Sequence, residues 1–278
     1  MKAPNPHLDY FAALVSDDAQ LPLTEAAISL AHDAYPQLDV QGELITLDTW
    51  GRQLRAAIPF DAPPAYRLRA LRKFFFDELG FKGNRDHYYD PSNSYLNRVM
   101  VTRRGIPISL ALLLLELGQQ AGLSMEGVSF PGHFLLKVTP RNGVMEEVIL
   151  DPFTGAAERR EQLEERLSAQ AAAAGHPLHV QALLQSTPPR AVLARMLRNL
   201  QGIYRHLQSW RNLLAVQERL VILLPHEPIE RRERGLVHAR LNERDEALAD
   251  LQAYLDACPQ AEDAAQVRER MRALSRGD

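Results

Sequence analysis

Two polar residues, His133 and Asp151, interrupt apolar segments of the chain and could do chemistry together. Residues 126–138 alternate and are rich in Val, Phe and Leu, which predicts a β-strand. Residues 145–153 predict a returning strand, because Arg141-Asn142-Gly143 tolerates the positive φ of a tight turn. If the turn centres on its asparagine, cross-strand partners have numbers that add to 284, and His133 lies opposite Asp151.

The same register pairs Lys137 with Glu147 and Leu135 with Ile149. A slip of one residue in either direction would break these matched pairs, so side-chain matching favours this register. A carboxylate bonded to one imidazole nitrogen fixes the tautomer and leaves the other nitrogen free as a base. The pair is therefore either a reactive site or a polar link between two strands, and the sequence leaves both open.

A second candidate, Ser109, lies at the start of a predicted core helix. Gly105-Ile106-Pro107 places proline at the first helical position, residues 110–117 are apolar on nearly every side, and Gly122 ends the helix. Free backbone N–H groups and the helix dipole favour negative charge in a first turn, where a nucleophile or an oxyanion would be stabilised. Serine also occurs in first turns because its hydroxyl bonds nearby backbone, so Ser109 has two interpretations.

The loop before this helix contains Asp86, His87 and Asp90 among aromatic residues. These side chains could bind a metal, but their spacing matches no known coordination pattern, so we expect no metal and no other cofactor. Asn93 and Asn97 follow, at the start of a short predicted helix, and are candidates for holding the loop or a ligand. For Asn93 the alternative is a helix cap.

The composition is that of an ordinary globular protein. The 278 residues suffice for one large or two smaller domains, with 46% hydrophobic and 24% charged residues. A net charge of −3 gives no electrostatic reason to expect nucleic acid or an anionic membrane as partner. The single cysteine, Cys258, excludes an internal disulfide and a thiolate metal cluster.

No segment predicts membrane insertion or export. The longest apolar run, residues 106–115, is interrupted by Pro107 and Ser109 and is shorter than the roughly 20 residues that a bilayer requires. The N-terminus lacks the apolar core of a signal peptide. We therefore expect a cytoplasmic protein.

The chain divides into four expected parts. Residues 1–83 are expected to be helical, with helices over 8–15, 23–34, 38–58 and 66–79. Residues 84–157 hold the strands and the core helix. Residues 158–190, charged and then rich in alanine, predict an exposed helix or linker that ends at Pro188-Pro189. Residues 191–278 predict helices again.

The last part contains an internal repeat. Pro225 and Pro259 lie 34 positions apart, and Leu214 with Leu248 share this offset. A 34-residue period with small, apolar and aromatic positions is the signature of tetratricopeptide repeats, each a pair of antiparallel helices. Two repeats are fewer than a free-standing array needs, so we expect them to pack on the rest of the protein.

Several motifs together identify a family resemblance. They are G-F-K-G-N at 80–84, Y-Y-D-P-S-N-S-Y-L-N at 88–97, R-G-I-P-I-S-L at 104–110, F-P-G-H-F-L at 130–135 and L-D-P-F at 150–153. With them the chain resembles, along nearly its full length, the bacterial transglutaminase-like proteins of the SirB type, which carry C-terminal tetratricopeptide repeats.

The resemblance implies an α+β fold with three parts: a helical N-terminal region, a papain-like core with a buried helix on a small antiparallel sheet, and C-terminal tetratricopeptide-type helices. It assigns the superfamily's histidine to His133 and its aspartate to Asp151. An ungapped match of the core helix puts the superfamily's cysteine position at Pro107, which has no nucleophile. The resemblance therefore gives no support to thiol acyl transfer.

Three hypotheses follow. The first is a non-catalytic protein whose residual His–Asp pocket binds a ligand and whose repeats bind a protein or peptide. The second is a hydrolase or acyl transferase in which His133 activates Ser109 and Asp151 orients the histidine. Two residues along a helix turn a side chain by about 200°, which counts against Ser109 in the place of Pro107. The third is metal binding by the pair with His87. The ligand and the oligomeric state stay open.

Overall fold

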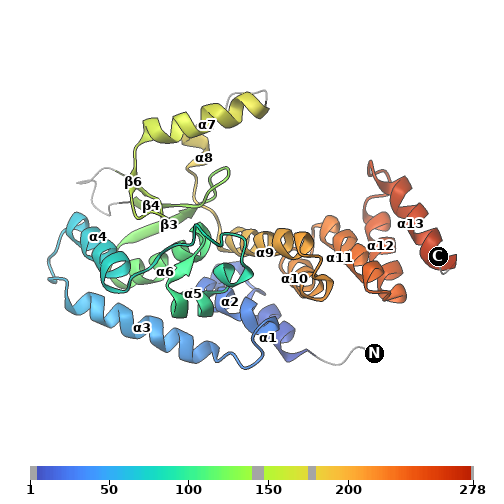
Figure 1. Ribbon diagram of the computed structural model, residues 1–278, viewed down its shortest axis with the longest axis horizontal. Coiled ribbons are helices and arrows are strands. Elements are labelled where there is room, and N and C mark those ends of the chain that lie inside the picture. Colours follow the sequence, from blue (N-terminus) through green and yellow to red (C-terminus); the bar gives the residue numbers. More distant parts are fainter. Residues whose placement is uncertain (1–4, 140–146, 175–179, 277–278) are drawn as a thin grey trace. The chain divides into compact units, whose positions relative to one another are not determined.

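The computed structural model describes residues 5–139, 147–174 and 180–276, and the side chains of all of these except 168–174 (Figure 1). The chain forms two compact units. The sheet unit comprises residues 22–31 and 37–196, and the repeat unit comprises residues 1–21, 32–36 and 197–278. The division into four parts made from the sequence is a different grouping and stays a prediction.

Helices form the first part of the chain, as the apolar spacing predicts. They are α1 (Pro6–Leu14), α2 (Leu23–Ser29), α3 (Val40–Ala56) and α4 (Pro64–Arg72). The helix predicted over 66–79 changes its hydrogen bonding after Arg72, because Lys73–Glu78 is a π-helix in which the N–H of Leu79 donates to the carbonyl of Phe74 at 2.8 Å. Such turns are often found at functional positions, although none of the site residues lies on this one.

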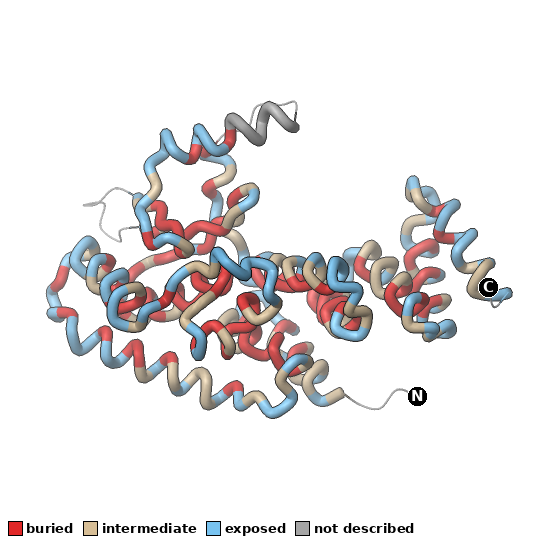
Figure 2. Tube along the Cα trace, in the orientation of Figure 1, coloured by how far each residue is buried: buried red, intermediate tan, exposed pale blue. Residues whose placement is uncertain are grey.

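The centre of the sheet unit is the predicted core helix, α6 (Pro107–Gln120), which is buried along most of its length (Figure 2). Before it come a 3₁₀ turn (Pro91–Ser94) and α5 (Leu96–Thr102). A short parallel pair, β1 (Lys82–Gly83) with β2 (Arg104–Gly105), ties the chain before the loop to the residues just before α6. The ends of the 84–105 segment are therefore fixed together.

The main sheet is antiparallel, with strand order β3-β4-β5-β6. Its strands are β3 (Ser124–Val128), β4 (Leu135–Thr139), β5 (Val148–Leu150) and β6 (Ala157–Glu158). The prediction of one strand over 126–138 is wrong, because the chain turns at Pro131-Gly132 and pairs β3 with β4. Gly132 has φ +69°, a left-handed conformation that glycine adopts without the steric cost of a side chain.

The predicted register is also wrong, by two positions. Lys137 lies opposite Ile149, so partner numbers add to 286. An even displacement leaves every side chain on its predicted face, which is why apolar matching did not reveal it. Lys137 pairs instead with Glu126 on β3, with Nζ 3.2 Å from Oε2. The predicted turn at 141–143 lies outside the described residues.

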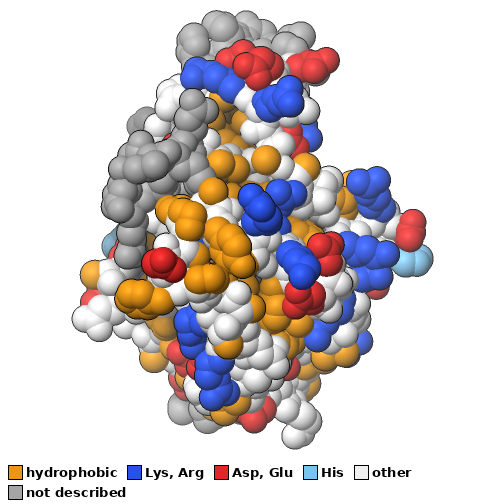
Figure 3. Space-filling view, turned by 90° about the vertical axis from the view of Figure 1, so that its left-hand side faces the viewer, with side chains coloured by type: hydrophobic (Ala, Val, Ile, Leu, Met, Phe, Trp, Pro, Cys, Tyr) orange, Lys and Arg blue, Asp and Glu red, His pale blue; other side chains and the backbone are white. Residues whose placement is uncertain are grey.

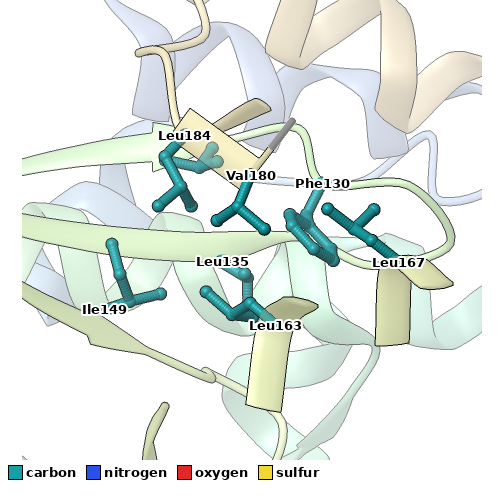
Figure 4. Close-up of a cluster of buried hydrophobic side chains, with 8 residues drawn as sticks. Phe130, Leu135, Ile149, Leu163, Leu167, Val180 and Leu184 are labelled. Carbon is teal, nitrogen blue, oxygen red and sulfur yellow. The ribbon is translucent and has the colours of Figure 1, made fainter. Parts of the chain in front are cut away.

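Helices cover both faces of this sheet. One face packs on α6, and the other packs on α7 (Arg160–Ala174) and α8 (Val180–Leu183) (Figure 1). Leu163 and Leu167 of α7, 1% and 2% exposed, join Leu135 and Ile149 in one apolar cluster (Figure 4). The predicted helix is present and its other described side chains are exposed, but these two leucines lie one turn apart and form a buried stripe that the prediction of an exposed segment did not include.

An exposed aromatic residue marks the connection between α3 and α4. Phe60 is 100% exposed, and Arg67 holds its loop by donating to the carbonyls of Phe60 and Ala62 at 2.7 and 2.9 Å. Figure 3, which looks at the side of the molecule where α3 meets α4, shows hydrophobic side chains gathered near the middle of that face. Hydrophobic groups of this kind on a surface often mark a contact with another molecule.

The repeat unit is built from antiparallel helix pairs, which confirms the predicted repeats. Its helices after α9 (Pro189–His206), which begins in the sheet unit, are α10 (Trp210–Leu223), α11 (Pro228–Arg240), α12 (Arg244–Ala257) and α13 (Ala264–Arg276). Gly235 allows α11 to approach α12 closely, since a Cβ there would lie 3.0 Å from Leu251. In the described part of the chain, no helix combines the length and apolar character needed to cross a membrane.

A groove of about 580 Å³ lies between α12 and α13. Leu255 and Met271 contribute apolar surface to it. The charged side chains that line it are Asp256, Arg268, Arg272 and Arg276. The groove is therefore amphipathic, with three guanidinium groups on α13 at intervals of four residues, which place them on one side of that helix.

Candidate functional site

His133 lies in the turn between β3 and β4, two residues before β4 begins at Leu135. Its N–H donates to the carbonyl of Phe130 at 3.0 Å across Pro131-Gly132, which closes the turn. The histidine therefore stands at the end of the strand and not within it. This position leaves the imidazole partly exposed, with 21% of the side chain accessible.

Asp151 lies directly after β5, at the same end of the sheet. Its carboxylate is 3% exposed, and Oδ1 lies 2.9 Å from Nε2 of His133. The N–H of Phe153 donates to the same oxygen at 2.8 Å. The structure thus brings the two predicted side chains together, although each occupies a turn and not the cross-strand position that the predicted register gave it.

The charge state of Asp151 follows from these contacts. Burial alone would raise the pKa of Asp151, but the bond and charge of His133 and the N–H of Phe153 together lower the pKa below its usual value. The carboxylate is therefore ionised at neutral pH, and Nε2 of His133 carries the proton that it donates. The other ring nitrogen, Nδ1, has no hydrogen-bond partner among the described residues.

Ser109 is not part of this pair. It is fully buried, and its Oγ accepts from the N–H of Ile106 at 3.1 Å. The same oxygen lies 2.6 Å from the carbonyl of Asn93 and 3.0 Å from that of Ile106. One hydroxyl has a single proton, so both its donor and its acceptor capacity serve the backbone. The geometry counts against Ser109 as a nucleophile.

Asn93 organises the loop in front of the sheet and is 2% exposed. Its Nδ2 donates to the carbonyls of His87 and Tyr88 at 2.6 and 3.2 Å, and its Oδ1 accepts from Asn84 at 3.0 Å. The side chain therefore holds the loop, which is one of the three roles considered for it. The alternative cap role is wrong, because Asn93 lies within the 3₁₀ turn, which is capped by Asp90 with its carboxylate accepting from the N–H of Ser92 at 2.8 Å, and the cap position of α5 is Tyr95.

The other predicted site residues, His87 and Asn97, make few side-chain contacts in the described structure. His87 takes part through its backbone, with its N–H bonded to Asn84 and its carbonyl to Asn93, while the residue itself is exposed. Asn97 is 8% exposed, and its Oδ1 has no partner among the described residues. No group of three or more His, Cys, Asp or Glu side chains suited to a metal occurs in the described ranges.

Arg195, on α9, contacts the His133 turn and was not predicted. Its Nη2 donates to the carbonyl of His133 at 2.6 Å, and both terminal nitrogens lie 3.3 Å from the carbonyl of Phe130. Its guanidinium carbon lies 5.5 Å from the centre of the Phe134 ring. A single arginine on an amphipathic helix, 62 residues from His133, gives no signal in the sequence.

Tyr88 completes the surroundings of the pair. Its ring lies 6.1 Å from that of Phe153, two residues after Asp151. Burial and, to a smaller extent, Tyr89 raise the pKa of Tyr88, while the positive charge of Arg195 acts to lower that pKa. The loop, the two turns and α9 thus meet around one His–Asp pair.

Two family models match the chain. The model of the transglutaminase-like superfamily matches residues 43–198, and a tetratricopeptide-repeat model matches residues 200–272. These ranges agree with the sheet that carries the His–Asp pair and with the helix pairs that follow it. The first model alone covers more than half of the chain.

Similar proteins occur in bacteria and animals. A UPF0162 protein of Xylella fastidiosa is 35% identical over 257 residues, which cover 91% of this chain and 89% of the relative. Protein SirB1 of Salmonella typhimurium is 27% identical and covers 70% of this chain and 71% of its own. F-box only protein 21 of Homo sapiens is 47% identical over 70 residues, 25% of this chain and 11% of that protein. The chain belongs to the transglutaminase-like superfamily, as a SirB-type protein with tetratricopeptide repeats.

Proposed function

We propose that this protein acts by binding and not by thiol acyl transfer. The His133–Asp151 pair is its residual polar site, and the C-terminal repeats bind a protein or peptide. The observation that carries the proposal is a histidine bonded to a buried carboxylate with no nucleophilic side chain bonded to it among the described residues. Acyl transfer through a side-chain nucleophile needs that nucleophile within hydrogen-bond reach of the histidine.

The distribution of candidate nucleophiles supports this proposal. The position matched to the superfamily's cysteine is Pro107, the first residue of α6. The only cysteine, Cys258, ends α12 in the repeat unit. Ser109, the alternative nucleophile, is fully buried and bonded to backbone groups. The alternative of a hydrolase or acyl transferase that uses Ser109 therefore has no supporting contact.

Chemical labelling tests whether position 107 faces the pair. A thiol at a helix N-terminus beside a histidine has a lowered pKa and reacts faster. In a Cys258→Ser background, the Pro107→Cys variant should react with iodoacetamide about tenfold faster than the same variant with His133→Gln. Equal rates, or no reaction at position 107, would remove the argument that a nucleophile has been lost from this place.

The repeat unit offers the groove between α12 and α13 for a partner. The arginines of the groove favour a peptide segment with acidic side chains. The apolar surfaces of Leu255 and Met271 favour a peptide that also carries apolar side chains. Arg272→Glu with Arg276→Glu should abolish capture of a partner that wild type retains from lysate. Arg270→Glu, on the same helix but outside the groove lining, is the matched control. Equal loss in the control would point to non-specific charge attraction.

The same capture experiment tests the pair. His133→Gln and Asp151→Asn each remove the ionic contact while keeping side-chain size. If either variant captures the partner as wild type does, the pair has no part in that interaction, and the proposal reduces to the repeats. A hydrolase assay in which Ser109→Ala abolishes turnover would contradict the proposal as a whole.

A further inference from the structure

The turn that presents His133 is held from outside its own hairpin. Within the turn, one backbone bond joins His133 to Phe130 across Pro131-Gly132. Glycine has more accessible backbone conformations than other residues, so contacts from other elements help to fix the conformation of the turn. The carbonyls on both sides of the turn accept further bonds from Arg195.

We infer that Arg195 is the positioning residue that holds the His133 imidazole against Asp151, by binding the two carbonyls that bracket the turn. The inference rests on the proposed function, in which the His133–Asp151 pair is the polar part of a binding site. It gives that site a third element, α9, which the sequence motifs do not include.

The chemistry of the side chain suits this role. A guanidinium group is planar and presents several donors in a fixed fork, so one arginine can bind two carbonyls at once. Its short contact, 2.6 Å to His133, lies on the residue that must be positioned. The ring of Phe134, the next residue, lies 5.5 Å from the guanidinium carbon and limits its movement. A lysine would keep the charge but not the fork.

The hydrogen bond between His133 and Asp151 tolerates only a small displacement of either side chain. Nε2 and Oδ1 are 2.9 Å apart, and a hydrogen bond is lost beyond about 3.5 Å. Asp151 is fixed by the N–H of Phe153 and by its place after β5. The distance between the two side chains therefore depends on how the His133 turn is held. Arg195, the His133 turn and Asp151 all lie in the sheet unit, so these contacts are made within one compact unit.

The test uses three variants of the full-length protein. Arg195→Lys keeps the charge and removes the fork, and Arg195→Met removes both. Arg198→Met is the matched control, because Arg198 lies one turn further along α9 and bonds Glu230 in the repeat unit. The readouts are the ¹³C titration of the Asp151 carboxylate and the ¹H signal of the Nε2 proton of His133. Asp151→Asn and His133→Gln assign the two signals.

If the planar guanidinium group positions the turn, both Arg195→Lys and Arg195→Met should change the Asp151 and His133 signals. The titration midpoint of Asp151 should rise by about half to one pH unit, because the bond from His133 is made less often. The Nε2 proton signal should broaden through exchange with water. Arg195→Met should also raise the pKa of Tyr88, since the charge of Arg195 acts to lower it. Arg198→Met should leave all three signals unchanged.

Unchanged Asp151 and His133 signals in Arg195→Lys and Arg195→Met would overturn the inference. Near-ultraviolet circular dichroism shows which variants are folded. If Arg195→Met does not fold, Arg195→Lys decides the question by itself, because the conservative variant separates the fork from the charge.

Partner capture separates this inference from the proposed function. Altered signals with normal capture would support positioning and count against a role of the pair in binding. If the signals stayed unaltered in the Arg195 variants while His133→Gln lost capture, the result would count against positioning by Arg195 and support a role of the pair in binding.

Discussion

The His133–Asp151 pair and the Ser109–Asn93 network are both polar groups set among apolar residues, yet their polar atoms are used differently. Ser109 and Asn93 are buried, and their side chains bond backbone groups. In the pair, a partly exposed imidazole bonds a buried carboxylate and keeps one nitrogen without a partner in the described chain. Free bonding capacity therefore separates a candidate site from a structural network.

The comparison has an energetic side. Removing one member of a fully satisfied buried network leaves the other groups unpaired, which costs about 1–3 kcal/mol for each group. In the pair, the imidazole is partly exposed, so water can bond it when Asp151 is replaced and can take its place when His133 is replaced. Stability should therefore fall more for changes in the network than for changes in the pair, and ligand binding should show the opposite order.

The largest effect is expected for Asn93→Asp. The new carboxylate would face the carbonyls of His87 and Tyr88 in place of the Nδ2 donor that bonds both. We expect the free energy of unfolding to fall by about 3–4 kcal/mol, measured by urea denaturation. Asn212→Asp, at an exposed position, should change it by less than about 0.5 kcal/mol. A loss below about 1 kcal/mol for Asn93→Asp would show that the network is solvated.

Ser109→Ala comes next. It leaves the N–H of Ile106 and the carbonyl of Asn93 without their hydroxyl partner in a fully buried place. The expected loss of stability is about 1–3 kcal/mol. The Nε2 proton signal of His133 should stay as in wild type. If that signal changed, the network and the pair would be one site, and the comparison above would fail.

Asp151→Asn tests the pair itself through pH. Because the pKa of Asp151 is lowered in the folded protein, its stabilising effect is present above the unfolded value, about 3.9, and is lost as the pH falls through the folded pKa. The free energy of unfolding of the wild type should exceed that of the variant by about 1 kcal/mol at pH 7. The difference should shrink below about pH 4. A difference that is constant between pH 7 and pH 3 would mean that Asp151 carries no depressed pKa.

The smallest effect concerns the sheet register. Lys137 pairs with Glu126, whose side chain is 46% exposed, so Glu126→Gln should cost no more than about 1 kcal/mol. Glu147→Gln, at the position that the predicted register placed opposite Lys137, should have no measurable effect. The same urea denaturation compares the two. A larger loss for Glu147→Gln would restore the predicted register and move the turns that hold the pair.

Local patterns in the sequence determined much of this protein. The apolar spacing predicts α3 and α6, and Pro107 at the first helical position predicts where α6 begins. The 34-residue period predicts the helix pairs of the repeat unit. The motifs around His133 and Asp151 identify the family and the two residues that meet. These features depend on residues a few positions apart, on a fixed repeat length, or on motifs that are recognised directly from the sequence.

Only the tertiary structure decided where the strands turn and what each polar group bonds. The alternation of residues 126–138 fits one long strand as well as two strands joined by a turn at Pro131-Gly132. A register displaced by two residues keeps every side chain on its face of the sheet, so the side-chain pattern does not reveal the displacement. The burial of Leu163 and the backbone bonds of Ser109 depend on surfaces brought from elsewhere in the chain. Arg195 reaches the His133 turn across 62 residues, and no local pattern records such a contact.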